Sequence, residues 1–243
     1  MSSGNSPRVD NKKLQKSGIR YIVKTYLTIL IQAIIFFIAS GTIFVFIGWV
    51  FYGMYVISSS VNLILLYKIN PELLNLRVKM QKGTKSWDKI IVHTCTVINF
   101  LYPLLTGLDI GRFHWTTLDA TTLLIFFISG TILWIISVIL GNWAMISNKH
   151  FESSVRIQTE RDHKVINIGP YKHVRHPGYA SVVTLYLAIP LVLGSFISFI
   201  PSGLYILLFM IRTYLEDNTL IKELKGYAEY SQEVKYRILP GIW

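Results

Sequence analysis

Long runs of apolar residues alternate with short polar segments along almost the whole chain. A helix needs about 20 mainly apolar residues to cross a hydrocarbon core of about 30 Å. Six runs approach or exceed that length: Tyr21–Ala39, Ile43–Tyr67, Ile90–Gly107, Thr122–Ile146, Tyr179–Gly194 and Phe196–Tyr214. The pattern predicts an all-α, polytopic integral membrane protein with about six transmembrane helices.

The polar segments between the runs predict how the spans are joined. Ser40-Gly41-Thr42 predicts a tight turn, because glycine accepts positive φ; one very long bent helix is the alternative. Lys68–Lys89 is predicted to be a charged loop, and Leu108–Thr117 a short one. The fifth run is only about 24 Å long as a helix. It also contains Pro190, so we expect it to tilt, kink or form a hairpin with the sixth.

The basic residues are distributed very unevenly over these segments. If both ends of a six-span chain are cytoplasmic, 23 of the 24 Lys and Arg residues face the cytoplasm, and only Arg112 lies outside. Cytoplasmic loops of membrane proteins carry an excess of Lys and Arg. The charge pattern therefore predicts cytoplasmic N- and C-termini.

Composition limits the other classes of function. The formal net charge of +11 would suit nucleic acid, but the basic residues lie between apolar runs, so we predict no nucleic-acid partner. The single cysteine, Cys95, lies in an apolar run and predicts a small packed residue. The His, Cys, Asp and Glu residues show no spacing that is familiar from metal sites, so we predict no metal site. The start of the chain lacks the pattern of a cleavable signal peptide. The oligomeric state leaves no signal in the sequence.

These observations divide the chain into three regions. Residues 1–20 predict a flexible basic tail, and residues 21–146 a four-helix transmembrane region. Residues 147–243 predict a catalytic region, because they contain the most specifically spelled polar stretch of the chain.

That stretch, Gly169–Tyr179, begins at a predicted turn and ends where an apolar run starts. Gly169-Pro170 favours a turn, and Pro177 favours the first position of a helix. Arg175 and His176 would then lie at a helix N-terminus, which suits an anionic ligand group.

Two stretches together resemble the isoprenylcysteine carboxyl methyltransferase family and the related phospholipid N-methyltransferases. They are Arg175-His176-Pro177-Gly178-Tyr179-Ala180-Ser181 and, after an apolar hairpin, Arg212-Thr213-Tyr214-Leu215-Glu216-Asp217. The resemblance extends from about Gln158 to the C-terminus. Ser181 and Asp217 depart from the family's Gly and second Glu, which affects the substrate assignment more than the family assignment.

The resemblance implies S-adenosyl-L-methionine as the cofactor, bound at a cytoplasmic C-terminal site. It implies cofactor contacts from Gln158, His163, Lys164, Val165, Ile166, Tyr171, His176, Pro177, Gly178, Tyr179 and Glu216. The backbone of 163–166 would run extended past the adenine. Gly226–Trp243 would close over the cofactor as a lid.

The resemblance also implies the catalytic residues, Arg212 and Glu216. Their i, i+4 spacing puts them on one helical face. In the family, the Glu that matches Glu216 contacts the cofactor, and the Arg that matches Arg212 lies near the methyl acceptor. The acceptor is expected to be a lipophilic small molecule or lipidated group, most simply an isoprenylcysteine-type carboxylate, that arrives from the bilayer.

Other interpretations remain open on the sequence alone. The same pattern fits transfer to a phospholipid amine or a small thiol. A sterol-type NADPH membrane reductase is similar in its C-terminal half. Arg212 and Glu216 would be a plain interfacial ion pair in a non-enzymatic scaffold or transporter, and Tyr171 and Tyr179 would then be interfacial belt residues.

Overall fold

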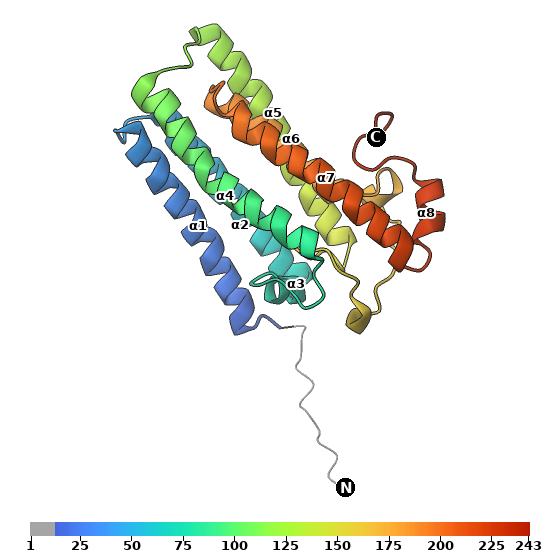
Figure 1. Cartoon of the computed structure of the whole chain (residues 1–243). Coiled ribbons are helices and arrows are strands. Elements are labelled where there is room, and N and C mark those ends of the chain that lie inside the picture. Colours follow the sequence, from blue (N-terminus) through green and yellow to red (C-terminus); the bar gives the residue numbers. More distant parts are fainter. Residues whose placement is uncertain (1–12) are drawn as a thin grey trace.

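The structure, a computed structural model, describes residues 13–243, and this part of the chain is helical without any β-strand (Figure 1). The predicted tail falls largely on residues 1–12, outside the described part, and its last five residues belong to the first helix. The α-helices are α1 (Lys16–Ser40), α2 (Phe46–Ile69), α3 (Pro71–Leu76), α4 (Ser86–Gly107), α5 (Ala120–Ser147), α6 (Pro177–Leu193), α7 (Phe199–Glu223) and α8 (Tyr227–Glu233).

Five helices are long and apolar enough to cross a membrane: α1, α2, α4 with its continuation to Phe113, α5 and α7. The sixth predicted span, α6, has 17 residues. At 1.5 Å per residue it is about 26 Å long, a little short of a hydrocarbon core. The all-α, multi-pass membrane fold with about six membrane helices is thus confirmed, with α6 as the short member.

The predicted turns have clear physical causes in the structure. Gly41 has φ 71° and its N–H donates to the Ile38 carbonyl, which ends α1 and rules out one continuous helix over the first two runs. α6 begins at Pro177, as predicted, and ends at Gly194 with φ 62°. Left-handed φ values favour glycine at helix ends.

Two predicted loops are wrong. The segment 68–89 contains α3, whose Leu73 and Leu74 are fully buried. Asn70 caps this helix by accepting from the Leu73 N–H, a start signal that the many charges of the segment obscured. The segment 108–117 begins with a π-helix, Leu108–Phe113. This helix extends α4 and buries Asp109.

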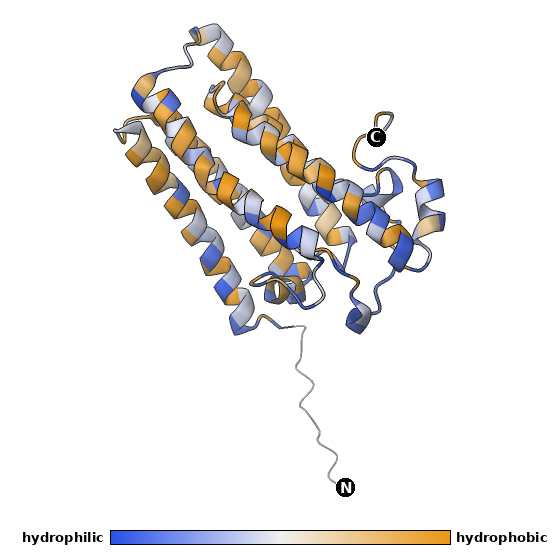
Figure 2. Ribbon diagram, in the orientation of Figure 1, coloured by the Kyte–Doolittle hydropathy of each residue, from blue (hydrophilic) through white to orange (hydrophobic). Residues whose placement is uncertain are grey.

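Hydrophobic residues predominate along the long helices, and hydrophilic residues are more frequent at the end that holds α3 and α8 (Figure 2). Ile38, Ile90 and Ile139 are each more than 60% exposed, as expected where lipid is the solvent. An aromatic cluster from α1, α2, α5 and α6 fills the inside of the bundle, around Phe36 and Trp134.

The connections α2–α4 and α5–α6 lie at the same end of the bundle as α8, and the π-helix with Arg112 lies at the other end (Figure 1). This arrangement agrees with the separation of charges on which the topology prediction rests. The side of the membrane that each end faces stays a prediction.

Candidate active site

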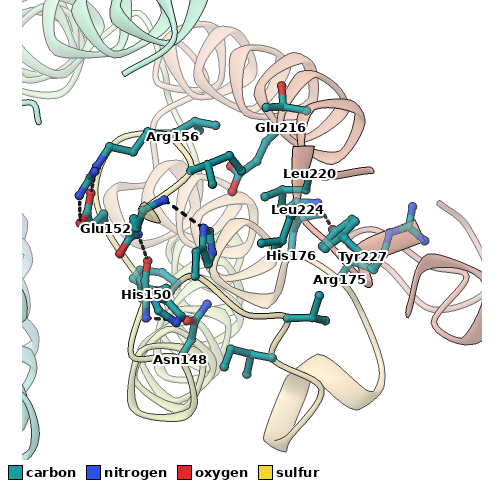
Figure 3. A pocket seen from close by; sticks show the side chains of 18 of the residues that line it. Asn148, His150, Glu152, Arg156, Arg175, His176, Glu216, Leu220, Leu224 and Tyr227 are labelled. Atoms are coloured by element: carbon teal, nitrogen blue, oxygen red, sulfur yellow. Dashed lines mark hydrogen bonds and ion pairs between the residues drawn. The ribbon is translucent and has the colours of Figure 1, made fainter. Parts of the chain in front are cut away.

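A pocket opens at the polar end of the bundle, between the α5–α6 connection, the start of α6, the end of α7 and α8 (Figure 3). Its free space, including the open mouth, is about 860 Å³, within the range of small-molecule sites. Most of the residues predicted to contact the cofactor line it: Gln158, His163, Lys164, Val165, Ile166, Tyr171, His176, Gly178, Tyr179 and Glu216. Pro177 and Arg212 do not line it.

The turn that was predicted to hold an anionic ligand group holds an internal carboxylate instead. Arg175 donates from Nε and Nη2 to the two oxygens of Asp217, at 2.8 and 2.7 Å. Its Nη1 donates to the carbonyl oxygens of Val234 and Lys235. Arg175 therefore joins the turn to α7 and to the segment after α8, and its charge is already neutralised within the chain.

Asp217 is fully buried and receives further donors. Tyr227 donates its hydroxyl to Asp217 at 2.9 Å, and Arg237 donates from Nε at 2.8 Å. His176 Nε2 lies 3.2 Å from the same carboxylate. We call Asp217, Arg175, His176, Tyr227 and Arg237 the Asp217 cluster; it fixes the two motif halves and the C-terminal segment relative to one another.

Glu216, one residue earlier, has a different role from Asp217. It lines the pocket and accepts a hydrogen bond from the hydroxyl of Tyr179. The Tyr179 ring stacks on His176, with 5.5 Å between centroids and an interplanar angle of 3°. Glu216 thus presents a carboxylate to the pocket with no cation of the described chain paired to it.

Arg212 does not pair with Glu216. Its Nε donates to Asp88 at 2.7 Å, and its Nη2 donates to the Ser153 carbonyl at 2.9 Å. Its guanidinium lies 5.3 Å from the centroid of Tyr179, which lines the pocket. Asp88 is fully buried and also accepts from the Val155 N–H. The ion pair joins α7 to α4 and leaves Nη1 without a hydrogen bond in the described chain.

The predicted backbone contact to the cofactor has a suitable segment. Residues 163–166 run without regular secondary structure along the pocket. Within residues 13–243, the backbone groups of Lys164, Val165 and Ile166 take part in no hydrogen bond. The Val165 side chain packs with Leu224 and Tyr230. This stretch therefore offers both an apolar surface and unpaired backbone donors and acceptors.

Gln158, by contrast, is used to hold the loop. Its side-chain amide donates to the His150 carbonyl at 2.7 Å, and its amide oxygen accepts from Arg161 at 2.8 Å. Arg156 braces the same loop by two hydrogen bonds to Glu152. Gln158 is buried at the pocket wall, where it fixes the backbone on which neighbouring pocket residues lie.

Several pocket residues were not predicted from the sequence. The main additions are Asn148, His150, Glu152, Arg156, Leu220, Leu224, Tyr227 and Tyr230. Leu220 and Leu224 follow Glu216 at four-residue intervals, so the helical repeat was a signal for them. Tyr227 and Tyr230 lie on α8, within the segment that was predicted to close over the cofactor, and the other four come from the α5–α6 connection, which has no periodicity.

Ser181, a departure from the family motif, lies in a helix contact outside the pocket. Its hydroxyl donates to the Ser137 carbonyl at 2.9 Å, and Ser137 donates back to the Ser181 carbonyl at 2.8 Å. The Ser181 hydroxyl also lies where a Cβ on Gly141 would be only 2.6 Å away. The substitution therefore adjusts the packing of α6 on α5.

Comparisons with known proteins give one family. The sequence model of the isoprenylcysteine carboxyl methyltransferase (ICMT) family matches residues 130–222. No curated protein sequence matches the chain. Among solved structures, a match is the eukaryotic intramembrane Ras methyltransferase ICMT without a monobody, with TM-score 0.42 and 15% sequence identity over 94% of this chain and 99% of that chain.

The matched region contains the turn at Arg175, almost all of the α6–α7 hairpin, and Glu216 and Asp217 of α7. It also contains the part of α5 on which the hairpin packs. The predicted resemblance is thereby confirmed over most of the residues that line the pocket; Leu224, Tyr227 and Tyr230 lie beyond the matched region. The chain is a multi-pass membrane protein whose residues 130–222 match the sequence model of the isoprenylcysteine carboxyl methyltransferase family.

Proposed function

We propose that the protein is an S-adenosylmethionine-dependent methyltransferase that methylates a lipophilic carboxylate of the isoprenylcysteine type. The observation that carries the proposal is Glu216. It places a carboxylate, which pairs with no cation of residues 13–243, in a pocket that also has an apolar wall. S-adenosylmethionine combines a sulfonium and an ammonium with a flat adenine, and this lining suits all three.

The residues present fit that cofactor. Glu216 would hold the cationic end, because a buried or half-buried carboxylate attracts a cation strongly. Val165, Leu220 and Leu224 would cover the adenine faces, and the unpaired backbone of 164–166 would bond its edge. Bound there, the cofactor would supply an electrophilic methyl group, with its positively charged sulfur as the leaving group.

The chain itself contributes positioning. A carboxylate acceptor is already a nucleophile at neutral pH, so no general base is needed. Arg212 retains one guanidinium nitrogen without a hydrogen bond in the described chain, and its guanidinium lies near the Tyr179 ring, which lines the pocket. We assign it the orientation of the acceptor, with Asp88 as the residue that positions it. Holding two reactants in line is a large part of catalysis for such a transfer.

Binding of S-adenosylhomocysteine to the purified protein in lipid nanodiscs tests the cofactor assignment. We expect saturable binding by calorimetry, and a thermal midpoint that rises with ligand concentration because only the folded state binds. NADPH should have no effect. Binding of NADPH without binding of S-adenosylhomocysteine would replace the proposal by the reductase alternative, and binding of neither would favour a scaffold.

A further inference from the structure

Two residues that line the pocket, His150 and Ser154, have buried side-chain polar atoms without a hydrogen-bond partner in the described chain, and His150 has two such atoms. It follows α5 directly, and only 5% of its surface is exposed. Neither Nδ1 nor Nε2 has a hydrogen-bond partner, although both are buried. Burying polar atoms without partners is unfavourable, so each such atom in a folded protein calls for an explanation.

The ring is held in place by its own backbone. The His150 N–H donates to the Asn148 side chain at 2.8 Å, and its carbonyl accepts from Gln158 at 2.7 Å. The imidazole lies against His163, with 4.6 Å between ring centroids. The imidazole is therefore held at a fixed place in the pocket wall (Figure 3).

Both imidazoles are neutral near pH 7. Burial, the largest effect, lowers the pKa of His150; the Gln158 side chain opposes this, Arg161 and Lys149 lower the pKa further, and Asp162 has a smaller opposing effect. Burial and then the His150 ring lower the pKa of His163 to about 4. A neutral imidazole carries one N–H donor and one bare nitrogen acceptor.

The donor and the acceptor of a neutral His150 imidazole limit which ligand groups can pair with both nitrogens. A carboxylate offers only acceptors and an ammonium only donors, so either would leave one imidazole nitrogen unpaired. The edge of a heteroaromatic base offers donors and acceptors together. In Figure 3, His150 and Glu216 lie on opposite walls of the pocket, on the α5–α6 connection and on α7, so the base and the cationic end of one ligand have separate places.

We propose that His150 is a specificity-determining residue that hydrogen-bonds the edge of the purine of the adenosyl cofactor. The inference rests on the proposed function, because it names a contact to the same ligand. It gives the buried imidazole nitrogens the partners that the chain does not supply. It also assigns discrimination among purines to a residue outside the motif stretches.

The test compares binding of S-adenosylhomocysteine with that of S-inosylhomocysteine, which differs at the purine edge. His150→Phe keeps a flat ring and removes both nitrogens; His150→Gln keeps a donor and an acceptor. His173→Phe is the matched control, because His173 is exposed and does not line the pocket. Calorimetry gives the affinities, and thermal unfolding without ligand gives the stability.

We expect His150→Phe to weaken S-adenosylhomocysteine binding about ten-fold, the value of one or two hydrogen bonds, and to bring the two ligands to similar affinities. His150→Gln should retain part of the preference, and His173→Phe all of it. The unliganded thermal midpoint of His150→Phe should be equal to or above that of the wild type, since it loses no internal hydrogen bond.

Unchanged affinity and preference in His150→Phe would overturn the inference while leaving the proposed function intact. So would a lowered unliganded midpoint with an unchanged preference, which would make His150 a packing residue. If the wild type binds neither ligand, the proposed function itself fails, and that result is recognisable before any variant is made.

Discussion

The membrane bundle and the polar end of the molecule are held together by different forces. The bundle comprises α1, α2, α4, α5, α6 and α7 as far as Ile211, and it is packed mainly through apolar and aromatic side chains. The polar end comprises residues 148–176 and 212–243. Every ion pair of the described chain has at least one partner there, and none joins two residues of 13–147.

The difference follows from what surrounds each region. Lipid tails accept apolar side chains anywhere on a helix surface, so the bundle needs few polar contacts beyond its own backbone hydrogen bonds. The polar end consists largely of irregular backbone, whose groups must be paired individually. Buried charges such as Asp88 and Asp217 supply that pairing, and they make the pocket sensitive to single polar substitutions.

Removal of Asp217 should separate the two regions most strongly. Asp217→Ala leaves Arg175 buried without its counter-charge. Breaking a buried pair by removing one partner costs about 3–5 kcal/mol. We expect the C-terminal segment 226–243 to become protease-sensitive while the membrane helices stay folded by circular dichroism. Cooperative loss of both regions would contradict the division.

Glu216→Gln should act on the ligand without affecting the fold. The amide can still accept from Tyr179, but its charge is gone. Loss of a charge-assisted contact costs about 1.5–3 kcal/mol, or about ten- to a hundred-fold in the affinity for S-adenosylmethionine. The unliganded thermal midpoint should stay near that of the wild type. An affinity equal to that of the wild type would remove Glu216 from the cofactor site.

Gly130→Val tests the packing of α5 against α6 in the bundle. A Cβ at Gly130 would lie 2.6 Å from the backbone nitrogen of Val192 on α6, whereas nothing lies within 4 Å of one at Gly53. Overpacking of this kind costs about 1–3 kcal/mol. We expect a lower thermal midpoint for Gly130→Val, an unchanged one for Gly53→Ala, and normal ligand affinity of the folded fraction in both. A normal midpoint for Gly130→Val would disprove the close α5–α6 packing.

Arg212→Lys should separate transfer from cofactor binding. A lysine keeps the charge but cannot reach Asp88, Ser153 and an acceptor at once. We expect methyl transfer to fall about ten-fold, the value of roughly one hydrogen bond in the transition state. The affinity for S-adenosylhomocysteine should stay within about three-fold of the wild-type value, which is a smaller change than the loss of one hydrogen bond would cause. A loss of affinity as large as that of Glu216→Gln would make Arg212 part of the cofactor site.

The smallest expected effect concerns pH. Because the folded-state pKa of His163 is lowered to about 4, the unfolded chain binds a proton that the folded chain does not between that value and the usual pKa of about 6.5. Stability should therefore fall as pH falls through this window and be constant above it. His163→Phe should reduce that slope in thermal unfolding; an identical slope would show that His163 is not buried as described.

The sequence predicted the bundle well, because each span leaves a local signal. The apolar runs predicted the spans, Gly41 predicted the first turn, and Pro177 predicted the start of α6. Two helices were missed. The apolar signal of α3 was obscured by the lysines around it. The π-helix follows Gly107, which packs so closely on α1 that a Cβ on Gly107 would lie 2.4 Å from the Phe36 carbonyl oxygen.

The polar end was predicted only where a motif names its residues. The family resemblance predicted that Tyr179 and Glu216 would line one site. It did not indicate that Asp88 on α4 would pair with Arg212. It also did not separate Glu216, which faces the pocket, from Asp217, which holds Arg175. Such long-range polar pairs leave no periodic signal, and His150 left none at all.

The most direct test of the account follows a labelled methyl group from S-adenosylmethionine to an acceptor. Protein in nanodiscs is incubated with N-acetyl-S-farnesylcysteine, with N-acetylcysteine, or with phosphatidylethanolamine. We expect label only with the farnesylated acid, and we expect alkali to release it as methanol, the signature of a methyl ester. Base-stable label on phosphatidylethanolamine or on the thiol, or no transfer by protein that binds S-adenosylhomocysteine, would contradict the proposed carboxylate acceptor.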